Sequence, residues 1–86
     1  MLPGDPRADP IVVDLIELAG LWVAAEDWGA LARTLRRLDE ELSNRFPDEQ
    51  DFSARFNELL EIVERPDSQR PSAEEIRRTY RRATVG

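Results

Sequence analysis

The chain has 86 residues, enough for one small domain, and its 12 basic and 18 acidic side chains give a formal net charge of −6. It has no cysteine and no histidine, which excludes disulfides, thiolate metal sites and histidine-based catalysis or metal binding. All twelve basic residues are arginines, so Schiff-base lysine chemistry and a P-loop lysine are excluded as well.

The beginning of the chain divides into a leader and a first helix. Residues 1–8 hold two prolines and one glycine, and we expect them to be a flexible leader in front of a single domain over residues 9–86. Asp9 followed by Pro10 is typical of a helix start, with a carboxylate cap and proline in the first turn. The sequence therefore predicts a helix over about residues 10–25.

This first helix is apolar on nearly every side. Between residues 11 and 25 only Asp14 and Glu17 carry charge. A helix of this kind is either central in a bundle or covered by another molecule. The sequence leaves both interpretations open, and with them the formation of a homo-oligomer.

Two amphipathic helices are predicted next, over about residues 28–45 and 51–64. Asp27 is the expected cap of the first, and Asp48 or Asp51 that of the second. Apolar side chains recur with the helical period in the first of these helices: Trp28, Leu31, Ala32, Leu35, Leu38 and Leu42. The segment 64–71 contains two prolines and is expected to run extended over the surface.

The last helix is predicted over about residues 73–83. Ser72 and Glu75 have the spacing of a capping box. The last seventeen residues carry a net charge of +3, against −9 for the rest of the chain. The narrow apolar stripe of this helix predicts that it packs on the domain: Ala73, Ile76, Tyr80 and Ala83. Its arginines either neutralise the acidic body or bind an anionic partner.

No segment has the alternating pattern of a strand. The fold class we predict is therefore all-α: a small bundle of three main helices, with a shorter C-terminal helix packed across it. No stretch is long and apolar enough for a membrane span, and we expect a cytoplasmic protein.

The sequence contains no nucleophile elbow, zinc-protease motif or glycine-rich phosphate loop. Carboxylate pairs on common helix faces are typical of any solvated acidic surface. We therefore expect no enzyme, with no catalytic residue, cofactor or metal site. The net negative charge disfavours nucleic acid as a partner. A protein-interaction module is the remaining class, and the partner-contacting residues we predict are Leu18, Trp22, Arg77, Arg78, Tyr80 and Arg81.

The order of elements resembles that of CATRA-system-associated small proteins, a bacterial family of predicted NTP-dependent conflict (defence) systems. The likeness covers residues 11–84. It is carried by Trp22 and Trp28 at the first corner, the helix from Ala30 to Leu42, the connector 65–71 and the closing sequence Glu-Glu-Ile-Arg-Arg at 74–78.

This resemblance implies a non-enzymatic accessory component of an anti-phage system. Its partner would be a larger protein encoded nearby, such as an effector, a sensor, an NTPase or a repeat protein. The alternative is a small regulator that binds nucleic acid or a nucleotide through the C-terminal arginines.

Overall fold

The structure is a computed structural model of the chain, and it describes residues 4–85. Its elements follow in the order η1 (Pro6–Ala8), α1 (Pro10–Ala25), α2 (Trp28–Arg45), α3 (Gln50–Val63), η2 (Asp67–Gln69) and α4 (Ala73–Val85). Here η denotes a short 3₁₀ helix. No strand occurs in this part of the chain, so the all-α prediction is confirmed.

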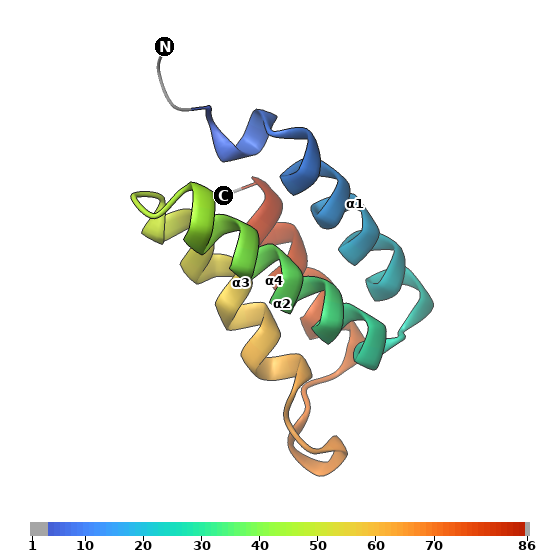
Figure 1. Cartoon of the computed structure of the whole chain (residues 1–86). Coiled ribbons are helices and arrows are strands. Elements are labelled where there is room, and N and C mark those ends of the chain that lie inside the picture. The colour runs from blue at the N-terminus through green and yellow to red at the C-terminus, as the bar shows by residue number, and fades with distance from the viewer. Residues whose placement is uncertain (1–3, 86) are drawn as a thin grey trace.

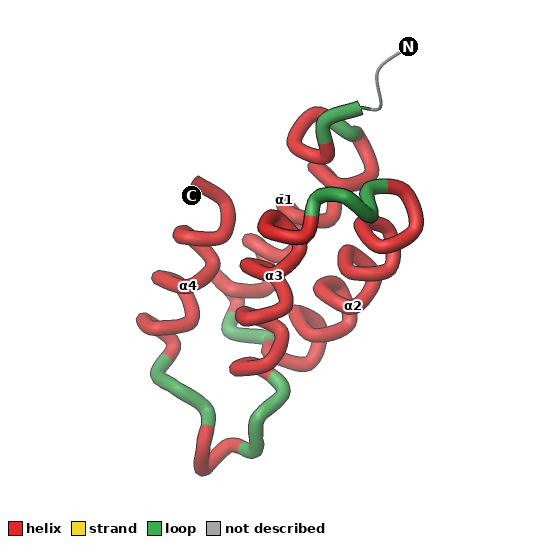
Figure 2. The backbone as a smooth tube through the Cα atoms, turned by 90° about the vertical axis from the view of Figure 1, so that its left-hand side faces the viewer, coloured by secondary structure: helices red, strands yellow, loops and turns green. Residues whose placement is uncertain are grey.

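The four α-helices form an up-and-down bundle (Figures 1 and 2). Each helix packs on the next one along the chain, and α4 also packs on α1, which closes the bundle. The start of α1 and the end of α4 therefore lie at the same end of the molecule (Figure 1). The whole measures 47 × 21 × 19 Å. The short α4 takes the fourth position, lengthwise against α1 and α3.

The helix starts follow from local hydrogen bonds. The Asp9 carboxylate accepts from the backbone N–H of Val12 at 3.1 Å, and that of Asp27 accepts from Ala30 at 3.1 Å. Both predicted caps are confirmed. Between them, Glu26 ends α1 in a left-handed conformation with φ 57°. Ser72 caps α4 by accepting from the Glu75 N–H at 3.3 Å.

Three boundaries differ from the sequence prediction. α3 begins at Gln50 with Glu49 in the cap position and no side-chain cap, so the prediction of Asp48 or Asp51 as cap was wrong. The connector is not extended throughout, because Asp67–Gln69 forms a 3₁₀ turn. α4 continues to Val85, one half-turn beyond the predicted end, because no proline or glycine stops it earlier.

The predicted leader also differs where the structure describes it. Pro6–Ala8 forms a 3₁₀ turn, in which the Asp5 carboxylate accepts from the Arg7 N–H at 2.9 Å. Pro6 is fully buried, so this turn packs against the domain instead of standing away from it. The part of the prediction that concerns residues 1–3 lies outside the described residues.

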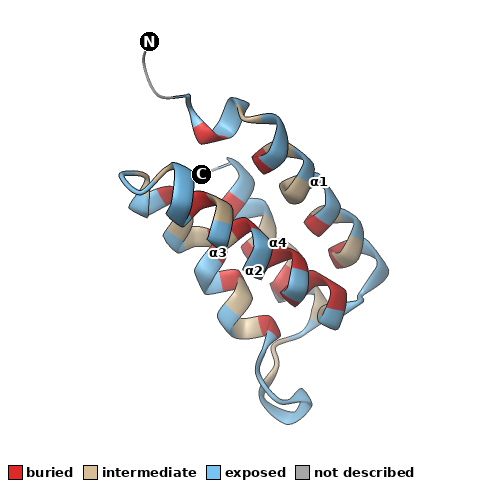
Figure 3. Ribbon diagram, in the orientation of Figure 1, coloured by how far each residue is buried: buried red, intermediate tan, exposed pale blue. Residues whose placement is uncertain are grey.

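The core lies along the bundle axis and draws unequally on the four helices (Figure 3). α2 and α3 supply most of its large side chains: Leu31, Leu35, Leu38, Leu42, Phe52, Phe56, Leu59 and Val63. α4 adds Ile76. α1 buries only Val12, Ala19 and Val23, although it is the most apolar helix of the four. Much of its apolar surface therefore lies outside the core.

Candidate interaction surface

The outward face of α1 carries large aliphatic side chains. Ile11, Leu18 and Leu21 are 47%, 37% and 65% exposed. Single exposed apolar residues are common on proteins, but neighbouring ones on one element are typical of a contact surface. Two half-buried residues, Leu15 and Trp22, lie beside them. We call these five side chains, Ile11, Leu15, Leu18, Leu21 and Trp22, the α1 stripe.

Four of the five members of the stripe lie on one line along the helix, and Leu21 lies beside Leu18 on the side of Asp14 and Glu17. Ile11, Leu15, Leu18 and Trp22 follow each other at intervals of four, three and four residues. With 3.6 residues per turn, alternate steps of four and three stay on one side of a helix. Val12, Ala19 and Val23, which α1 buries, lie on a different side. The stripe is thus a second apolar face, which adjoins the core through the half-buried Leu15 and Trp22 and is exposed at Ile11, Leu18 and Leu21.

An acidic edge accompanies the stripe. Asp14 and Glu17 are the only charged residues of α1, and both are exposed. Among residues 4–85, neither carboxylate forms an ion pair. Asp14 lies one turn from the exposed Ile11 and Leu18, whereas Glu17 lies one turn from Leu21, on the side of α1 that is turned toward Tyr80.

Trp22 connects the stripe to the bundle. Its indole Nε1–H donates to Oγ1 of Thr34 on α2 at 3.0 Å. The Thr34 hydroxyl in turn donates to the carbonyl of Ala30 at 2.9 Å, so this buried group is satisfied on both sides. Trp22 packs against the core and is half-buried. Trp22, which the sequence predicted as a contact residue, therefore mainly connects α1 to α2, and only part of its side chain is accessible to a partner.

Tyr80 has a comparable role between α1 and α4. Its hydroxyl donates to the carbonyl oxygen of Ile16 at 2.8 Å. A Cβ atom at Gly20 would lie 2.6 Å from that hydroxyl, so the close approach depends on glycine. Burial, and secondly the Glu17 carboxylate, raise the pKa of Tyr80 above its ordinary value. Tyr80 thus holds the tail helix on the domain.

The three predicted arginines differ in their surroundings. Arg77 pairs with Glu26 at 3.1 Å and so adds to the contact between α4 and the end of α1. Arg78 pairs with Glu74 of its own helix at 3.6 Å. Arg81 is exposed and lines a shallow groove of about 240 Å³ between α1 and α4, beside Tyr80.

The six predicted residues do not form one site. Trp22 reaches from α1 to α2, whereas Tyr80 and Arg77 reach α1 from α4. Because α2 and α4 pack on different sides of α1, the two groups lie apart. Of the six, Leu18 lies centrally on the exposed apolar face.

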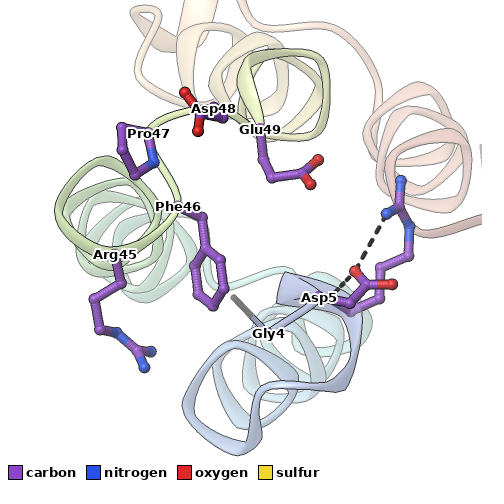
Figure 4. Close-up of a pocket in the computed structure, with 8 residues that line it drawn as sticks. Gly4, Asp5, Arg45, Phe46, Pro47, Asp48 and Glu49 are labelled. Atoms are coloured by element: carbon purple, nitrogen blue, oxygen red, sulfur yellow. Dashed lines mark hydrogen bonds and ion pairs between the residues drawn. The ribbon is translucent and has the colours of Figure 1, made fainter. Parts of the chain in front are cut away.

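A second hollow lies at the other end of α1, where η1 meets the corner between α2 and α3 (Figure 4). Its volume is about 300 Å³, and the ring of Phe46 points into it toward Gly4. Both acidic and basic side chains line it: Asp5, Arg7, Arg45, Asp48 and Glu49. This mixture of charges provides no field of one sign for an ionic ligand.

Close to this corner, Arg45 ties the end of α2 to the start of α1. Its Nη1 and Nη2 donate to the two carboxylate oxygens of Asp9 at 2.9 and 2.7 Å, and its Nε donates to Glu41 at 2.9 Å. The hydrogen bond from Arg45 lowers the pKa of Asp9, and its partner Asp9 raises the pKa of Arg45. Asp9 therefore both caps α1 and connects its start to the end of α2.

Sequence reasoning missed several residues of this surface: Ile11, Asp14, Leu15, Glu17 and Leu21. The steps of four and three residues along α1 were the signal that could have found Ile11 and Leu15, whereas Leu21 lies off that line. That signal is ambiguous in a helix that is apolar on all sides, because every line along it contains apolar residues. The structure resolves it by showing which line the core covers.

The comparisons with known proteins give no relative. No protein-family model matches the chain, and neither a curated protein nor a solved structure resembles it significantly. Within residues 4–85, none of the helices combines the length and the apolar character that crossing a membrane requires.

Proposed function

We propose that this chain is a non-enzymatic protein-interaction module, an adaptor that docks a larger protein through the α1 stripe. The observation that carries the proposal is the exposure of Ile11, Leu18 and Leu21 on the outward side of one helix. In line with the resemblance drawn from the sequence, we propose an accessory role in a bacterial conflict system. The larger protein would then be an effector or a sensor.

The energetic argument concerns the second apolar face of α1. Burying apolar surface contributes about 25 cal/mol per Å² removed from water, so a partner that covers this face gains affinity from it. Side chains at positions i, i+4, i+7 and i+11 are the anchors by which helices are recognised in grooves or by other helices. The stripe offers such anchors on a helix that the bundle already holds in place, so little ordering entropy opposes binding.

The alternative, a regulator that binds phosphate groups through the tail, has less support. Arg77 and Arg78 already pair with Glu26 and Glu74. The apolar side of α4 faces the core through Ile76 and Ala83, so this helix is part of the bundle. An incoming polyanion would also approach a chain of net charge −6. We therefore favour protein docking through α1.

Site-specific photo-crosslinking in the cells of origin tests the proposal. A photoreactive residue replaces Leu21, and a matched variant carries it at Ala54, which is exposed on α3. We expect one crosslinked product with a larger protein from position 21 and none from position 54. Equal labelling from both positions, or none from position 21, would contradict docking through α1. A partner encoded beside this chain would support the conflict-system role, whereas a ribosomal or flagellar partner would exclude it.

A further inference from the structure

We propose that the occupant of the α1 stripe is an amphipathic helix of a partner protein that carries arginine or lysine along its edge. This inference rests on the proposed function and names the chemistry of the partner. Steps of four and three residues are those at which two packed helices insert side chains between each other. Residues 10–25 form a helix about 24 Å long at a rise of 1.5 Å per residue, so roughly two heptads of a partner fit along it.

The acidic edge selects the charge of this partner helix. Asp14 borders the stripe one turn before Leu18, and Glu17 follows one turn before Leu21. A helix packed on the stripe removes water from these carboxylates, which costs free energy unless a cation replaces the water. No residue of α1 is basic, so α1 supplies no such cation. A guanidinium or ammonium group at the edge of the partner helix would supply it.

A second copy of this chain fits the surface less well. If two α1 helices packed on each other, both would bring Asp14 and Glu17 and neither would bring a cation. The carboxylates would then face apolar side chains or each other, and both arrangements oppose association. Each copy also carries a net charge of −6, which adds a general repulsion.

A membrane surface fits less well too. An anionic bilayer attracts basic edges and repels acidic ones. The α1 stripe has an acidic edge, the reverse of the pattern that holds an amphipathic helix on lipid headgroups.

Two synthetic peptides provide the test. Both are four heptads long with leucine at the core positions; one carries arginine at the flanking positions and the other glutamate. Calorimetric titration into the full chain measures their affinities. We expect the basic peptide to bind and the acidic one not to bind. The double variant Leu18→Ser/Leu21→Ser, whose thermal melt checks that it still folds, should abolish binding.

A charge-matched pair of variants locates the interaction. Asp14→Asn with Glu17→Gln removes the acidic edge, and Glu40→Gln with Glu58→Gln removes two exposed carboxylates from α2 and α3. Because exposed ion pairs are weak, the first variant should weaken the basic peptide only about threefold to tenfold. The second should leave its affinity unchanged. Equal weakening by both variants would mean attraction by net charge alone and would overturn the proposal.

The remaining outcomes separate this inference from the proposed function. If both peptides bind equally and Leu18→Ser/Leu21→Ser abolishes the binding of both, docking through α1 is supported. The inference that the partner helix has a basic edge is then wrong. If neither peptide binds, the inference of a basic helical partner fails, and crosslinking from position 21 still decides whether a protein docks on α1. A dimer in sedimentation that Leu18→Ser/Leu21→Ser abolishes would make a second copy the occupant. Binding to anionic vesicles that needs Leu18 would make it a lipid surface. Each of these two results overturns the inference.

Discussion

The hydroxyl of Tyr80 occupies the space that a side chain at Gly20 would need. A Cβ atom there would lie 2.6 Å from the hydroxyl oxygen and 3.2 Å from Cζ of the ring. The same hydroxyl donates to the Ile16 carbonyl one turn earlier in α1. The contact between the first and the last helix therefore depends on one glycine in the middle of α1, at a position where alanine would favour the helix more.

This relationship predicts that Gly20→Ala stabilises the domain only when residue 80 is not tyrosine. In the wild-type background the new methyl group displaces Tyr80, and the lost hydrogen bond and packing cancel or exceed the gain in helix propensity. In a Tyr80→Leu background the same change should stabilise by about 0.5–1 kcal/mol, the ordinary gain of alanine over glycine in a helix. Urea unfolding of the four variants measures the cycle. Equal effects in both backgrounds would contradict the contact.

Tyr80 is the only tyrosine, so the absorption band of its phenolate reports its pKa directly. We expect an apparent pKa above the ordinary 10.0, because burial and Glu17 both disfavour the charged form. Glu17→Gln should lower it toward the ordinary value. Because the folded pKa is the higher one, the contribution to stability is complete below pH 10 and is lost as the pH rises through the folded pKa. Tyr80→Phe should lack this loss, and a titration at the ordinary pKa would exclude the buried position.

Thr34→Val should destabilise the domain by about 1 kcal/mol, because it leaves the Trp22 indole N–H without its acceptor. Valine has nearly the volume of threonine, so packing changes little. Thr34→Ser, which keeps the hydroxyl, is the control. In a Trp22→Phe background no donor remains, and Thr34→Val should cost less. The same cost in both backgrounds, measured by urea unfolding, would show that the hydrogen bond does not stabilise the fold.

Asp9→Asn should make stability less dependent on pH at the acid end. Asparagine also caps helices, so the change removes mainly the ion pair with Arg45. Since Arg45 lowers the pKa of Asp9, the contribution of Asp9 is present above its unfolded pKa, about 3.9, and is lost as the pH falls through the folded value. We expect wild type to lose stability more steeply than Asp9→Asn below about pH 4. Parallel curves from urea unfolding would contradict this.

The fold was predictable because local signals agreed along most of the chain. Asp9, Asp27 and Ser72 cap their helices as the sequence predicts, and the apolar period of α2 matches its buried face. The start of α3 was not predictable, because three acidic residues lie close together there, Asp48, Glu49 and Asp51, and the one at the cap position, Glu49, makes no cap hydrogen bond with its side chain.

The candidate surface was predictable only in part. An apolar helix gives no indication of which side the core covers, so Leu18 was recognised and Leu21 was not. The partners of Trp22 and Tyr80 lie 12 and 64 residues away, and no local pattern specifies them. Glycine at position 20 is compatible with close helix packing, but the sequence does not indicate that Tyr80 is the residue that approaches it.

The central claim is that the exposed face of α1 binds a basic amphipathic helix. Its most direct test is a nuclear magnetic resonance titration of the isotope-labelled chain with the basic peptide. We predict shifts concentrated at the exposed residues of α1, namely Ile11, Asp14, Leu18 and Leu21, with α3 unchanged. Shifts centred on the arginines of α4 or on the corner around Phe46, or no shifts at all, would contradict the claim.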